Sequence, residues 1–174
     1  MEEQRTHLIV RSATKYGLIL GVLSSLLFFG QTLSGMKQNW PITVANIVLL
    51  IALMVLSHLE IKKSRDGMMS YAQGLGSGTL LSAVAAVVRC ILMFVYLRYI
   101  NGGYLASVLQ AQRLALERRG VTGAQAQLAM GITASLTTPI GVAVSSLVGG
   151  IVLGFIAALI VSIFTQSEGR MVVT

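Results

Sequence analysis

The sequence predicts an all-α integral membrane protein: a four-helix bundle with one or two amphipathic helices between the third and fourth transmembrane helices. Hydrophobic residues make up 55% of the 174-residue chain and charged residues only 11%. A soluble domain of this size has a large surface to hydrate, and so few charged side chains would cover it poorly. In a bilayer most of the lateral surface faces acyl chains instead, so this composition favours a membrane protein.

Four apolar runs carry the transmembrane prediction. They cover residues 16–35, 41–59, 77–97 and 139–164. About 20 helical residues, rising about 1.5 Å each, cross the hydrocarbon core of a bilayer. Pro41 suits the first turn of the second helix, and Thr137 or Thr138 is placed to cap the fourth. We therefore expect one membrane domain over residues 1–174, in which residues 67–76 form a loop or a shallow interfacial turn.

The segment at about residues 103–136 is too polar to span the membrane but is patterned as helix. Its apolar residues fall near one helical face: Leu105, Val108, Leu109 and Leu116. Gly120 is placed as a helix C-cap, and Thr122 with Gln125 has the spacing of a capping box. We expect two short amphipathic helices that lie on the membrane or against the bundle.

The charge pattern predicts both topology and partners. The formal net charge is +7, and the basic residues flank the apolar runs, where they set orientation and meet anionic lipid headgroups. With the N-terminus inside, the second connection carries Lys62, Lys63 and Arg65, whereas the first carries only Lys37. We expect both termini in the cytoplasm, the first run retained as an anchor, and no binding of nucleic acid.

Groups that could carry catalysis are sparse. None of the six acidic residues lies in an apolar run, and the two histidines, His7 and His58, lie near run ends, where we expect His58 to be solvated. The single cysteine, Cys90, is expected to be a small buried core residue. Because no hydrolase, phosphate-loop or metal motif is present, we expect no enzyme activity, no catalytic or metal-binding residues and no cofactor.

Arg89, near the middle of the third run, calls for a functional hypothesis. An arginine at the centre of a membrane helix costs about 2.5–3.5 kcal/mol on insertion scales. Since no apolar run contains a carboxylate to pair with it, Arg89 is our candidate contact for an anionic solute, a lipid headgroup or a partner's carboxylate. The alternative is that it snorkels, or bonds within the bundle to polar side chains: Gln31, Thr32, Ser34, Ser77, Ser82, Ser145 and Ser146.

A ladder of small residues runs along the fourth apolar run and predicts a helix-packing seam. Its members recur every four residues: Ser146, Gly150, Gly154 and Ala158. In lipid, small residues let helices approach closely, and that packing is a main source of association. We expect the seam to be internal and not between subunits, because a small bundle first packs its own helices.

These features support two functional hypotheses. The first is a non-enzymatic protein that acts through association with protein or lipid partners, as an accessory subunit or an assembly factor. The second is an oligomeric transporter or channel for a small solute or an anion that uses Arg89. A homo-oligomer is an alternative to a foreign protein partner in either case.

Three short motifs give the chain a family resemblance. They are the segment Lys15-Tyr16-Gly17-Leu18-Ile19-Leu20-Gly21, the segment Ile61-Lys62-Lys63-Ser64-Arg65-Asp66-Gly67 followed by Tyr71-Ala72-Gln73-Gly74, and Leu136-Thr137-Thr138-Pro139. In this order they resemble a bacterial family known as domain of unknown function number 4199. The resemblance implies a four-helix protein of the bacterial inner membrane without an established activity, and it supplies no site residues.

Overall fold

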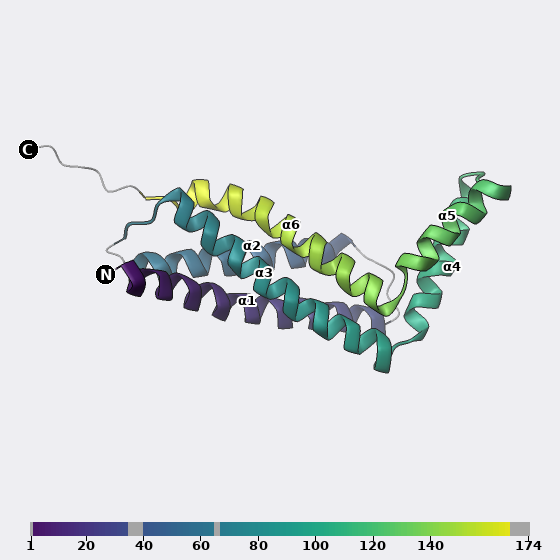
Figure 1. Ribbon diagram of the computed structural model, residues 1–174, viewed down its shortest axis with the longest axis horizontal. Helices are drawn as coiled ribbons and strands as arrows, with labels where there is room; N and C mark the ends of the chain where they lie inside the picture. The colour runs from purple at the N-terminus through teal and green to yellow at the C-terminus, as the bar shows by residue number, and fades with distance from the viewer. Residues whose placement is uncertain (1, 35–39, 65–66, 168–174) are drawn as a thin grey trace, which may run out of the picture. The chain divides into compact units, whose positions relative to one another are not determined.

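The computed structural model describes residues 2–34, 40–64 and 67–167, with side chains from His7 onward. Regular structure in these ranges is entirely helical (Figure 1). The elements are α1 (Glu2–Leu33), α2 (Trp40–Lys63), α3 (Tyr71–Val95) with a π-helical turn η1 (Tyr96–Ile100), α4 (Gly103–Arg118), α5 (Gly123–Leu136) and α6 (Pro139–Thr165). The connection at residues 35–39 and the charged pair Arg65 and Asp66 lie outside the described residues.

Four of these helices are long and apolar enough to cross a membrane. They are His7–Leu33, Trp40–Lys63, Tyr71–Ile100 and Pro139–Thr165. This confirms the all-helical fold class and the four predicted apolar spans. Helix α1 begins at Glu2, well before the apolar run that starts at Tyr16. Glutamate, glutamine, arginine and leucine in that first stretch are strong helix formers, so the helix extends beyond the apolar run.

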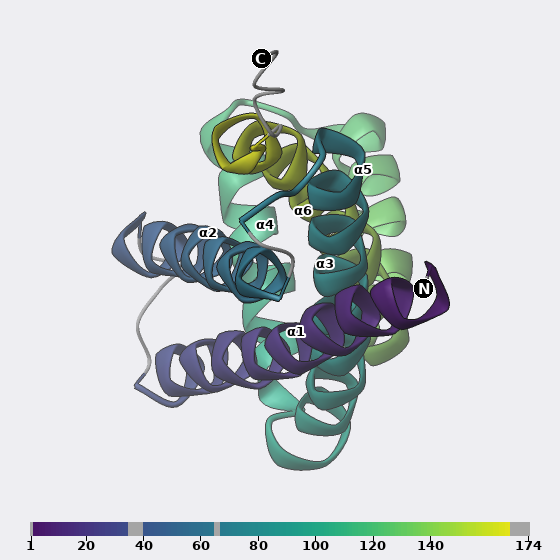
Figure 2. The same cartoon turned by 90° about the vertical axis from the view of Figure 1, so that its left-hand side faces the viewer.

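The chain forms two compact units, which we describe separately: the bundle unit, residues 1–89 with 147–174, and the hairpin unit, residues 90–146. In the bundle unit α1 and α2 form an antiparallel pair (Figure 2). Ser12 Oγ lies 3.2 Å from Ser57 Oγ, and Lys15 Nζ lies 3.1 Å from a Glu60 carboxylate oxygen. A shared apolar core includes Leu20, Met54, Leu81 and Ala158. Many outward apolar side chains stay exposed, as acyl chains require.

The segment between α2 and α3 differs from the sequence expectation. We expected a loop over residues 67–76, but α3 already begins at Tyr71. Ser70 and Gln73 form a reciprocal capping box: the Gln73 N–H donates to Ser70 Oγ at 3.4 Å, and the Ser70 N–H donates to Gln73 Oε1 at 3.2 Å. An isolated antiparallel bridge pairs Met69 with Ser167, so the entry to α3 is held to the end of α6.

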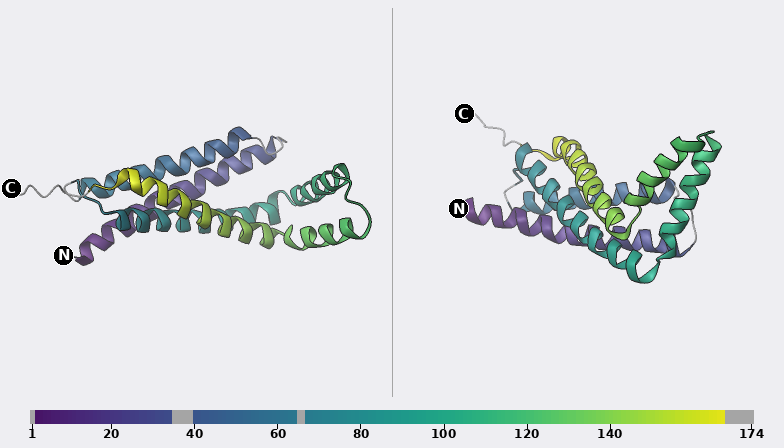
Figure 3. Two further views of the ribbon diagram at one scale, coloured as in Figure 1. Left: turned by 90° about the horizontal axis from the view of Figure 1, so that it is seen from above. Right: turned by 45° about the vertical axis from the view of Figure 1, so that its right-hand side comes forward.

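The hairpin unit contains the two helices α4 and α5, joined by a tight turn (Figure 3). Gly120 adopts φ 71°, and the Val121 N–H donates to the Leu116 carbonyl at 3.1 Å, which confirms the predicted glycine C-cap. The predicted capping box at Thr122 is wrong, because Thr122 is the N-cap of α5 but its side chain makes no capping bond. Thr138 caps α6 as predicted, accepting from the Gly141 N–H at 3.0 Å.

Tyr104, in the first turn of α4, illustrates the half-buried polar groups of this unit. Burial, and then the neighbouring Tyr96, raise the pKa of its phenol above the ordinary value. The Tyr104 N–H donates to Asn101 Oδ1 at 3.1 Å, and the Asn101 amide donates to the Tyr96 hydroxyl at 3.1 Å. These bonds order the backbone where η1 passes into α4.

Candidate functional site

The residues singled out from the sequence meet around α3, the helix against which the other three helices of the bundle unit pack. On one side, a Cβ added to Gly17 of α1 would lie 2.6 Å from the Leu81 carbonyl oxygen. A Cβ added to Gly21 would lie 2.7 Å from Val88 Cβ. Real Cβ atoms do not come this close to other atoms, so both glycines are required for the contact between α1 and α3.

The small-residue ladder of α6 lies against another side of α3. A Cβ added to Gly150 would lie 3.1 Å from Ala86 Cβ, and one added to Gly154 would overlap Ser82. Ala158 is fully buried, and its Cβ is 2.8 Å from the position that a Cβ on Gly78 would occupy. The structure therefore places this part of the ladder in an intramolecular contact. Ser146, in the hairpin unit, is half-buried, and its hydroxyl donates to the Ala143 carbonyl at 2.7 Å.

His58 was expected to be solvated at a helix edge, and this expectation is wrong. Its side chain has no exposed surface. Nδ1 lies 2.7 Å from Thr165 Oγ1 on α6, and Nε2 lies 3.1 Å from the Gly74 carbonyl oxygen on α3. A carbonyl oxygen only accepts hydrogen bonds, so Nε2 carries a proton. The imidazole thereby joins α2, α3 and α6 through two hydrogen bonds between helices.

The two hydrogen-bond partners of His58 come from other helices. The carbonyl that His58 contacts belongs to Gly74 on α3, and the hydroxyl belongs to Thr165, the last residue of α6. Neither residue identifies the other as a partner without the fold, because His58 and Thr165 are 107 positions apart. Ser162 is also fully buried, and its Oγ has no hydrogen-bond partner within the described part of the chain.

Arg89 is half-buried on α3, and its Nε is buried without a hydrogen-bond partner among the described residues. The ion pairs found in the described ranges, Lys15–Glu60 and Arg113–Glu117, do not include it. Serine hydroxyls that we weighed as partners donate to carbonyls of their own helices: Ser34 to Gly30, Ser77 to Gly74, and Ser82 to Gly78. The guanidinium of Arg89 therefore has no counter-ion among the described residues, and its buried Nε distinguishes it from the exposed Arg98 on the same candidate span.

The other side chains that could bind a metal or take part in catalysis are dispersed over the described residues. Over residues 2–34, 40–64 and 67–167, no group of three His, Cys, Asp or Glu side chains is placed to hold a metal ion. Cys90 is half-buried and is a free thiol, whereas we expected a small buried core residue. Asn46 on α2 has a buried Oδ1 without a hydrogen-bond partner in the described ranges.

A comparison of the sequence with known families finds a match over most of the chain. The family described as "Protein of unknown function (DUF4199)" matches residues 15–167. The chain belongs to this family. The match includes every feature described above except the start of α1 with Ser12, and it confirms the resemblance seen in the sequence. No curated protein and no solved structure matches this DUF4199 chain.

Proposed function

We propose that this DUF4199 protein is a non-enzymatic membrane subunit that acts by associating with a partner protein, as an accessory subunit or an assembly factor. The observation that carries the proposal is the buried, unpaired Nε of Arg89 on a membrane-spanning helix. A cation in this position is expensive in lipid and is normally paired or solvated inside a bundle. A carboxylate on a transmembrane helix of the partner supplies the missing counter-charge.

The packing of the small-residue ladder supports this choice of contact. Helix α3 already packs against Gly150, Gly154 and Ala158, so these residues are not free to contact a second chain. Recognition within the spans then depends on Arg89, a charged side chain whose buried Nε has no hydrogen-bond partner among the described residues. A bidentate pair between guanidinium and carboxylate is directional as well as strong, which suits selection of one partner.

Helices α4 and α5 are proposed as amphipathic helices that contact the membrane surface or the same partner. Neither helix has a fully buried residue. Leu128, Ile132 and Leu136 of α5 are exposed and recur every four residues, so they form an apolar stripe able to enter a bilayer interface. The proposal also places the protein in a bacterial inner membrane, with both termini in the cytoplasm.

Co-purification with matched arginine variants tests the proposal. The tagged protein is extracted gently from its own membranes, and the recovered partner is quantified for the parent, Arg89→Leu and Arg98→Leu. Arg98 is an exposed arginine on the same span and serves as the control. We expect Arg89→Leu to lose the partner and Arg98→Leu to keep it. Equal recovery from all three proteins would reject the role of Arg89.

An oligomeric transporter or channel for an anion is the second candidate, and Arg89 is again the observation that favours it. Four helices rarely enclose a solute path alone, so this function requires several copies of the chain. It predicts an anion-dependent flux in vesicles that contain the purified parent protein and loss of that flux with Arg89→Leu. Absence of flux in the parent would reject it.

A further inference from the structure

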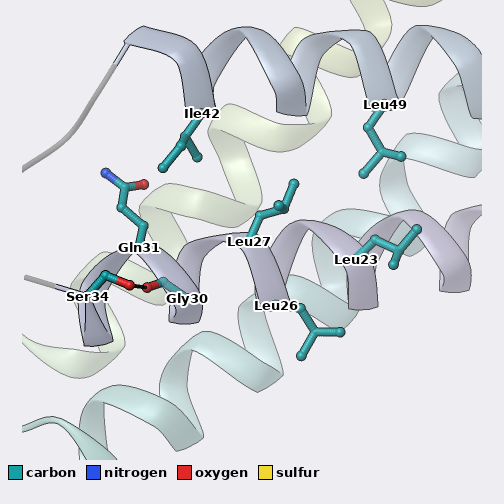
Figure 4. Close-up of a pocket in the computed structure, with 8 residues that line it drawn as sticks. All are labelled: Leu23, Leu26, Leu27, Gly30, Gln31, Ser34, Ile42 and Leu49. Carbon is teal, nitrogen blue, oxygen red and sulfur yellow. Dashed lines mark hydrogen bonds between the residues drawn. The ribbon is translucent and has the colours of Figure 1, made fainter. Parts of the chain in front are cut away.

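A groove opens between α1 and α2 toward the ends at which α1 finishes and α2 begins (Figure 4). Its volume is about 550 Å³, within the range of sites for small ligands. Its walls are mainly leucine and isoleucine: Leu23, Leu26, Leu27, Ile42 and Leu49. Gly30 leaves the wall open, because no heavy atom lies within 4 Å of the position a Cβ would take there.

The polar groups of the groove lie together at one end. Figure 4 shows Gln31 and Ser34 near the end of α1, with Leu23 and Leu49 at the opposite end. Ser34 Oγ donates to the Gly30 carbonyl at 2.7 Å, so its hydrogen is already used. Gln31 lines the same end of the groove, and its amide carries both a donor and an acceptor for a ligand.

The groove changes from apolar to polar along its length, as a bilayer does from its hydrocarbon interior to its headgroup surface. Leu23 lies in the interior of the span His7–Leu33, whereas Gln31 lies near its end. Eight residues of helix at about 1.5 Å each separate the two by about 12 Å. A molecule with an apolar tail against Leu23 and a polar head at Gln31 would have the orientation that lipids already have in the membrane.

We infer that the groove binds one phospholipid, with an acyl chain along the leucine walls and the ester or phosphate oxygens at Gln31. A second copy of the chain fits less well, because close helix packing requires small residues and this groove is walled by bulky ones. The wall residues Leu23 and Leu26 are exposed and belong to membrane-spanning helices, so acyl chains reach them directly. This site is distinct from Arg89 and does not depend on the proposed function.

Photo-crosslinking tests the site with a defined probe. Phosphatidylcholine carrying a diazirine in the middle of one acyl chain is titrated into the purified protein in detergent, illuminated, and mapped by peptide mass spectrometry. We expect labelling to saturate at one lipid per chain and to fall on Leu23, Leu26, Leu27 and Leu49. Gly30→Phe fills the groove and should lower this labelling about tenfold, the effect of losing about two buried methylene contacts.

Gly149→Phe is the matched control, because Gly149 is also an exposed helical glycine with open space around its Cβ position. It should leave the labelling unchanged. If Gly30→Phe does not fold, Leu26→Trp narrows the same groove from an exposed wall position. The site would be overturned by labelling that never saturates or that survives both groove variants. It would also be overturned by labelling that follows solvent exposure over outward residues such as Val152 and Ile156. Crosslinked pairs of chains without bound lipid would overturn it as well.

Discussion

Nδ1 of His58 lies 2.7 Å from Thr165 Oγ1, which joins the C-terminal part of α2 to the last residue of α6. The same ring bonds the Gly74 carbonyl near the start of α3 at 3.1 Å. Three membrane helices therefore share one fully buried polar contact at the end of the bundle unit where α1 begins. The contribution of this contact to the stability of the bundle can be measured by replacing His58.

His58→Leu should destabilise the bundle by about 1–3 kcal/mol, because it removes two interhelical hydrogen bonds and leaves the Gly74 carbonyl without the imidazole. The measurement is thermal unfolding in detergent, followed by circular dichroism. His7→Leu is the control, because His7 is exposed on α1. A melting temperature for His58→Leu equal to that of the control would show that the buried contact contributes nothing to stability.

The contact between α3 and α6 makes a second prediction. Gly154→Leu introduces a side chain where even a Cβ overlaps Ser82, and Gly150→Leu introduces one 3.1 Å from Ala86. Overpacking of this kind costs about 1–3 kcal/mol or more, so both variants should melt at lower temperature than the parent. Gly149→Leu, which meets open space, should not. If all three variants melted together, the close contact of α6 with α3 would be refuted.

Arg89→Leu should leave the stability of the isolated protein unchanged or raise it. The substitution removes a charge that lacks a counter-ion among the described residues and replaces it with a side chain suited to lipid. A structural arginine would behave in the opposite way, since its loss would break bonds inside the bundle. Thermal unfolding of Arg89→Leu, compared with Arg98→Leu, separates the two cases, and a clear drop for Arg89→Leu alone would favour the structural role.

Topology is testable at Ser107, an exposed residue of α4. In a Cys90→Ala background, a Ser107→Cys variant should react with a membrane-impermeant maleimide added from outside intact cells. The reason is that basic residues of the short connections favour cytoplasmic termini, and this orientation puts the segment between α3 and α6 outside. Reaction only after the cytoplasmic side has been opened would reverse the orientation.

The features that the sequence predicts correctly depend on local chemistry or on the membrane itself. Bilayer thickness alone sets the four spans, and a glycine C-cap at Gly120 or a threonine N-cap at Thr138 needs only neighbouring residues. The early start of α3 was also readable, because Ser70 and Gln73 have capping-box spacing, but the glycines that follow suggested a loop. Of these, Gly74 packs closely, since a Cβ there would lie 3.0 Å from Ser162 Oγ, whereas Gly76 lies in the helix with open space at its Cβ position.

The burial of His58 could not be predicted, because it depends on a residue 107 positions away and on a backbone carbonyl of another helix. The groove at Gly30 has the same origin. Its walls come from two helices, and only their separation in the fold decides whether the leucines touch or leave space. Arg89, in contrast, stood out from its position alone, since a charge within an apolar run is conspicuous in any fold.

Native mass spectrometry of the tagged protein, extracted gently from its own membranes, tests the central claim most directly. The account predicts a stoichiometric complex with a foreign chain that carries a carboxylate within a membrane helix, and loss of that chain from Arg89→Leu but not from Arg98→Leu. A monomer or a homo-oligomer in the parent, with no foreign chain, would contradict the proposed association.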